Sequence, residues 1–160
     1  MDSRTFLRAL YRAAISAVEP GRLVSEALSR RGNAVVARSV SDPGRREFVF
    51  VPRRVVLLAA GKAAVPMAAA AHRALGSLVA DSLVVAPDGA AEEIAPPPGR
   101  FLATAHPVPD ERSVAAGRAV LELASGLHRE ELLVVLLSGG ASSLMALPGE
   151  EITLDEKTRT

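Results

Sequence analysis

Three continuous apolar runs, each closed by a turn, constrain the fold of this chain most strongly. They cover residues 54–60, 82–86 and 132–137. Apolar runs without polar alternation are typical of strands that are buried on both faces of a sheet. Helical patterns separate them, one over the alanine-rich residues 63–75 and one that begins at Asp110. Strands that alternate with helices predict an α/β fold with a doubly wound, mostly parallel, Rossmann-like sheet.

The first fifty residues predict smaller elements beside this sheet. Apolar residues recur at three- and four-residue steps over 7–18 and predict an amphipathic helix. A second short helix is predicted over 22–31, where Gly32 would end it. Strands are predicted over 34–40 and 48–50, with a tight turn over 41–44 between them, so this part of the chain should contain a peripheral hairpin.

The charge pattern excludes some partners and leaves two locations open. The formal net charge is +1, so charge gives no reason to expect nucleic acid or a membrane surface, and no apolar stretch approaches the ~18 residues of a membrane span. The first helix carries Arg4, Arg8 and Arg12, which is also typical of a mitochondrial presequence. We interpret it as the first helix of the domain and therefore predict a cytoplasmic protein, with a mitochondrial one as the alternative.

The last ten residues contain the start signal of a helix. Thr153 and Glu156 have the spacing of a capping box, but only four residues follow Glu156. So short a segment is not expected to propagate a helix. We therefore expect residues 1–160 to be one α/β domain that is truncated at its C-terminus.

A glycine-rich turn follows the third apolar run and is the first candidate for ligand binding. Consecutive glycines allow the backbone to approach a ligand, and the N–H groups at the start of the next helix favour an anion. The serine hydroxyls add further donors. The alternative is a plain turn that needs glycine only for packing. The candidate residues are Ser138, Gly139, Gly140, Ser142 and Ser143.

Lys62 is the second candidate, because it follows another buried strand. Ligands of such sheets bind beyond the carboxyl ends of the strands, so Lys62 and residues 138–143 should face each other along one rim. The chain has nineteen basic residues, of which only Lys62 and Lys157 are lysines. A compact ammonium group could pair with a carboxylate or a phosphoryl group, although a solvated surface lysine is the alternative. No Walker A loop, nucleophile elbow or dinucleotide fingerprint occurs.

The loop over residues 104–113 is the third candidate. His106 lies just beyond a predicted strand, and Asp110 and Ser113 mark the start of the following helix. The loop could shape a substrate pocket, or it could be a rigid turn into a capped helix. Three widely separated histidines and no cysteine give no basis for a metal site, and Asp88 and Asp110 are the only carboxylates we expect at this rim.

Together these segments resemble the N-terminal domain of the glycerate 2-kinase family, the class II glycerate kinases that carry a C-terminal MOFRL domain. Three blocks, residues 59–68, 106–117 and 137–144, match in order and separation. The resemblance spans nearly the whole chain, but members of the family are more than twice as long, and the MOFRL-type domain is not within residues 1–160.

The resemblance implies transfer of the ATP γ-phosphoryl group to glycerate with Mg²⁺, which gives 2-phosphoglycerate. Lys62 would then be the charged catalytic residue. Substrate or phosphate would be contacted by the glycine turn and by His106, Asp110 and Ser113. Residues 1–160 would be poorly active alone, since the site lies between two domains. The sequence also fits a non-catalytic module that binds a sugar acid or a sugar phosphate, and it is compatible with a homo-oligomer.

Overall fold

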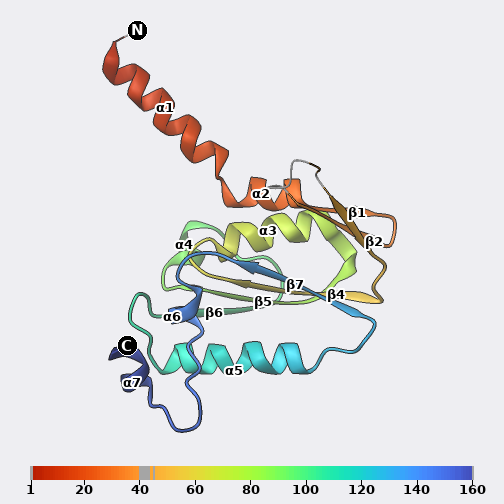
Figure 1. Ribbon diagram of the computed structural model, residues 1–160, viewed down its shortest axis with the longest axis vertical. Coiled ribbons are helices and arrows are strands. Elements are labelled where there is room, and N and C mark those ends of the chain that lie inside the picture. Colours follow the sequence, from red (N-terminus) through yellow and green to blue (C-terminus); the bar gives the residue numbers. More distant parts are fainter. Residues whose placement is uncertain (1, 40–43, 45, 160) are drawn as a thin grey trace.

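The computed structural model describes residues 2–39, 44 and 46–159 and contains two sheets. Four parallel strands form the larger sheet in the order β6-β5-β4-β7, and three antiparallel strands form the smaller one in the order β1-β2-β3 (Figure 1). The larger sheet comprises β4 (Arg54–Ala60), β5 (Val79–Pro87), β6 (Arg100–Thr104) and β7 (Glu131–Leu137). The smaller sheet comprises β1 (Leu28–Arg31), β2 (Ala34–Arg38) and β3 (Glu47–Phe50).

Helices cover both faces of the parallel sheet, which confirms the predicted α/β fold. On one face α3 (Ala64–Leu75) packs on alternate strand residues such as Leu57 and Val84. On the other face α5 (Glu111–Ser125) and α6 (Ala141–Leu144) pack on the intervening residues such as Leu58 and Leu83 (Figure 1). The alternation follows from the two-residue period of a strand, so a continuous apolar run serves two cores.

The N-terminal helix forms as predicted but does not pack against the rest of the chain. Helix α1 (Ser3–Ala17) has no buried residue and projects away from the sheets (Figure 1). Its apolar side chains, including Leu7 and Tyr11, are more than half exposed. Among the described residues, no helix is long and apolar enough to cross a membrane.

The predicted second helix is wrong beyond residue 27. Helix α2 covers Pro20–Ala27, and the next four residues form β1, which pairs with β2 in a hairpin. Gly32 is left-handed with φ 61°, but it lies in the turn between these strands rather than at a helix end. Hydrogen bonds with β2 outweigh a helical preference that is weak over four residues. The expected turn over 41–44 lies largely outside the described residues.

Strand β7 differs from the expected buried strand, because it is an edge. It pairs in the described part of the chain with β4 alone, and Val135 and Leu137 are 44% and 57% exposed. Its apolar run predicts the strand correctly but not its neighbours, since periodicity carries no information about which side of a strand is paired.

The remaining elements are short. They are η1 (Gly76–Leu78), α4 (Ala90–Glu93) and α7 (Leu154–Arg159). The capping box before α7 is formed, since Thr153 N–H donates to Glu156 Oε2 over 2.8 Å and Glu156 N–H donates to Thr153 Oγ1. The expectation that too few residues remain for a helix is therefore wrong, because the cap stabilises the six-residue helix α7.

Candidate functional site

The two predicted loops meet at the carboxyl edge of the parallel sheet. Strands β4 and β7 are neighbours in register, with Ala60 opposite Leu137, so the loops that follow them are adjacent rather than facing across a gap. Lys62 N–H donates to the Gly139 carbonyl over 2.9 Å, and Ser138 N–H donates to the Ala60 carbonyl over 2.9 Å. The backbone of each loop is thus fixed by the other.

Ser138 is used to join these loops. Its hydroxyl accepts a hydrogen bond from Ala63 N–H over 3.0 Å and donates to the Ala60 carbonyl. Gly61 is in the positive-φ region at 122°, and a Cβ there would lie 2.5 Å from the Ser138 carbonyl oxygen. The sequence suggested Ser138 as a ligand donor, whereas in the structure its hydroxyl already has two protein partners. The close approach at Gly61 was not foreseen, because it depends on the strand order.

Lys62, His106 and Gly140 come together at this edge. A Cβ added at Gly140 would lie 2.8 Å from His106 Cδ2 and Nε2 and 3.5 Å from Lys62 Cγ. Gly140 has φ 92°, a conformation that L side chains rarely adopt. The imidazole ring and the lysine stem therefore both contact the turn where a side chain is missing. Lys62 is exposed and His106 is half-buried, so both can reach a ligand from solvent.

The serines after the turn lie on the short helix α6. Ser143 Oγ donates to the Gly140 carbonyl over 3.0 Å, which fixes the turn to the helix. Ser142 is exposed on the same helix. Thr104, which the sequence did not single out, is buried at the end of β6 and its hydroxyl donates to the Leu144 carbonyl over 2.9 Å. This bond attaches the strand that precedes His106 to the helix that follows the glycine turn.

Asp110 and Ser113 are held in the capping box of α5. Asp110 accepts hydrogen bonds from Arg112 and Ser113 N–H, and the fully buried Ser113 hydroxyl accepts one from Asp110 N–H. In this structure the hydroxyl of Ser113 is therefore turned to the backbone. These contacts correspond to the second interpretation of the sequence, in which the loop over residues 104–113 is a rigid turn into a capped helix.

Arg112 pairs with both carboxylates at this edge. Its guanidinium donates to the two Asp88 oxygens over 2.7 and 2.8 Å and to Asp110 over 2.8 Å. These hydrogen bonds hold the pKa of Asp88 and of Asp110 below the ordinary value of an aspartate. Both carboxylates stay ionised and share the one Arg112 guanidinium, and their lowered pKa values disfavour a role as general base. The sequence did not show this pairing, because Asp88 is distant from Arg112 along the chain.

The fold and this edge define a class: a doubly wound α/β domain whose ligand edge carries a lysine, a histidine and a glycine turn. A family model described as a domain of unknown function, DUF4147, matches residues 6–160. The chain belongs to this family, and its relatives identify it as the N-terminal domain of the glycerate 2-kinase family.

Similarity to individual proteins is consistent over most of the chain. The D-glycerate 2-kinase of Thermotoga maritima is 37% identical over 82% of this chain and 33% of its own, and the human glycerate kinase is 32% identical over 94% and 30%. A crystal structure of a Pyrococcus horikoshii protein superposes with a TM-score of 0.77, at 30% identity, over 97% of this chain and 33% of that one. The chain thus spans about a third of the length of the curated relatives it matches.

Proposed function

We propose that this chain supplies one wall of a site at which the γ-phosphoryl group of ATP is transferred to glycerate, giving 2-phosphoglycerate and ADP. The observation that carries the proposal is the convergence of Lys62 and His106 on Gly140, at the edge where ligands of parallel sheets bind. The Thermotoga maritima relative is called a D-glycerate 2-kinase, which supports this substrate. A cytoplasmic location remains a prediction.

The proposed reaction places negative charge at this edge. The C2 hydroxyl oxygen of glycerate attacks the γ-phosphorus, the bond from that phosphorus to the ADP oxygen breaks, and the hydroxyl proton is released to solvent. Catalysis of such a step rests on positioning and on stabilising charge. The exposed ammonium group of Lys62 would stabilise the phosphoryl oxygens or hold the glycerate carboxylate, with His106 beside it as a hydrogen-bond donor.

The residues that the structure describes provide no ligand set for Mg²⁺. These residues contain no group of three His, Cys, Asp or Glu side chains that could hold a metal ion, and the edge carboxylates are paired with Arg112. The residues at this edge therefore do not fit a resident metal, and we assign no step of the reaction to one. ATP and Mg²⁺ remain proposed partners of the family reaction.

A non-catalytic module that binds a sugar acid or a sugar phosphate is the second candidate. The pairing of Asp88 and Asp110 with Arg112 favours it, because neither carboxylate is free to accept the hydroxyl proton. The same lysine, histidine and glycine turn would then hold the anion without transferring a group.

Calorimetric titration with D-glycerate and, separately, with MgATP tests the anion site. We expect Lys62→Met to weaken binding roughly tenfold, the loss of one charge-assisted contact. Lys157→Met, at the other lysine of the chain, is the matched control and should leave binding unchanged. Equal affinity of the two variants would overturn the proposed role of Lys62.

Phosphorus NMR of the same mixtures separates the two candidate functions. Formation of any 2-phosphoglycerate supports transfer and rules out the binding module as the sole function. We expect little turnover from these residues alone, since a phosphoryl-transfer site needs groups on every side of the substrate. Rapid turnover would refute that expectation.

A further inference from the structure

The loop that presents His106 is anchored at both ends. It begins after Thr104, which is buried at the end of β6 and whose carbonyl accepts a hydrogen bond from Asp88 N–H over 3.2 Å. It ends at Asp110, whose carboxylate caps α5 and accepts from the Arg112 guanidinium over 2.8 Å. Only five residues lie between these two anchors. The positions of the anchors therefore restrict where the imidazole can lie.

Asp88 connects the two anchors to each other. Its N–H holds Thr104, and its two carboxylate oxygens accept from Arg112 over 2.7 and 2.8 Å. The same guanidinium also donates to Asp110, so Arg112 and Asp88 close a ring of contacts around the His106 loop. A guanidinium that binds a carboxylate through two parallel bonds fixes direction as well as distance. The charged side chains are about half exposed, so the main consequence of their pairing is geometric rather than a large gain in stability.

We propose that Arg112 is a positioning residue, which together with Asp88 clamps the loop over residues 105–109 and holds the His106 imidazole against Gly140. The contact is close, since a Cβ added at Gly140 would lie 2.8 Å from His106 Cδ2 and Nε2. A small displacement of the loop would therefore remove it. All three guanidinium nitrogens donate to the two carboxylates, so Arg112 acts through the loop rather than by contact with a ligand. The inference rests on the proposed function, because that function assigns His106 to ligand binding.

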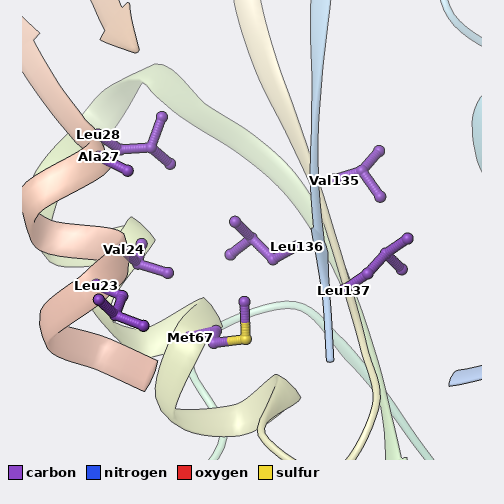
Figure 2. Close-up of a pocket in the computed structure, with 8 residues that line it drawn as sticks. All are labelled: Leu23, Val24, Ala27, Leu28, Met67, Val135, Leu136 and Leu137. Carbon is purple, nitrogen blue, oxygen red and sulfur yellow. The ribbon is translucent and has the colours of Figure 1, made fainter. Parts of the chain in front are cut away.

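The clamp is tested without a ligand, by the nuclear Overhauser effect between the His106 imidazole protons and the Gly140 α-protons. We expect Arg112→Gln to reduce this signal to roughly half or less, because the loop then populates other positions. Arg118→Gln, at an exposed arginine of the same helix, should leave it unchanged. Val24→Ala controls for lost stability: Val24 lies in the apolar groove between α2 and β7, on the face of the sheet opposite α5 (Figure 2). An unchanged signal in Arg112→Gln, or an equal loss in either control, would overturn the proposal.

Asp88→Asn shows whether Asp88 and Arg112 act as one unit. This variant keeps the N–H that holds Thr104 and removes the charge that Arg112 binds. We expect it to lower the same signal, and we expect the double variant with Arg112→Gln to lose no more than Arg112→Gln alone. Losses that add in the double variant would contradict a shared clamp.

Calorimetry with D-glycerate separates a failure of this inference from a failure of the proposed function. If Arg112→Gln leaves His106 in place for roughly a third of the time, the affinity for D-glycerate falls roughly threefold. A reduced signal with unchanged affinity would overturn the positioning role of Arg112. If the unmodified chain does not bind D-glycerate, the proposed function fails, and the signal measured without ligand still decides whether the clamp exists.

Discussion

Replacing Gly61 by alanine should destabilise the chain strongly. Gly61 joins β4 to the Lys62 loop with φ 122°, and a Cβ there would lie 2.5 Å from the carbonyl oxygen and 2.8 Å from the carbonyl carbon of Ser138. Ser138 cannot move easily, because its N–H donates to the Ala60 carbonyl and its hydroxyl accepts from Ala63.

Two costs add for this variant. An unfavourable φ for a residue with a Cβ costs about 1–3 kcal/mol. Forcing an extra carbon against packed backbone costs about 1–3 kcal/mol more. We therefore expect Gly61→Ala to lower the free energy of unfolding by about 4 kcal/mol, which for a chain of this size is a fall of roughly 8–16 °C in melting temperature.

Gly32→Ala separates the two costs. Gly32 also has positive φ, at 61°, but nothing lies within 4 Å of the position its Cβ would take. Only the conformational cost remains, about 1 kcal/mol. Urea denaturation followed by circular dichroism measures both variants against the original chain. A Gly61→Ala variant no less stable than Gly32→Ala would refute the close packing of the Lys62 loop on the glycine turn.

Three further predictions follow from single contacts. Gly140→Ala should push the neighbouring imidazole from the turn and weaken D-glycerate binding by calorimetry about tenfold, whereas Gly139→Ala, with open space at its Cβ, should not. Arg112→Gln should lower the free energy of unfolding at pH 7, because Asp88 and Asp110 lose the partner that lowers their pKa. The fall of this free energy below about pH 4 should then be less steep, since a carboxylate with a lowered pKa stabilises the fold only while it is ionised. An unchanged pH profile of urea unfolding would count against the pairing. Thr104→Val should cost about 1–3 kcal/mol by leaving a buried carbonyl without its donor, and Thr104→Ser should restore most of it in the same assay.

The sequence predicts the parallel sheet and the edge that carries the candidate site. The apolar runs before Lys62 and Ser138 indicate strands of one parallel sheet, and the residues after them must then share its carboxyl edge. The sequence also predicts the helix start at Asp110, because a cap acts within three residues along the chain.

What the sequence does not predict depends on contacts between distant segments. The pairing of Arg112 with Asp88 and the use of the Ser138 hydroxyl as a bridge both require the strand order, which no local pattern contains. Residues 28–31 continue a helical pattern, yet they form β1 because β2 offers them a hydrogen-bonded partner. The exposure of β7 likewise depends on which strands lie beside it.

NMR titration with D-glycerate tests the central claim most directly, that Lys62, His106 and the glycine turn form one anion-binding site. Amide and imidazole resonances are followed while the D-glycerate concentration is raised to several times the Kd of a weak site, which is about 1 mM. We predict saturable shifts that concentrate at Lys62, His106, Gly139 and Gly140 and that disappear in Lys62→Met. Shifts that are absent, that cluster elsewhere, or that persist in Lys62→Met would contradict the account.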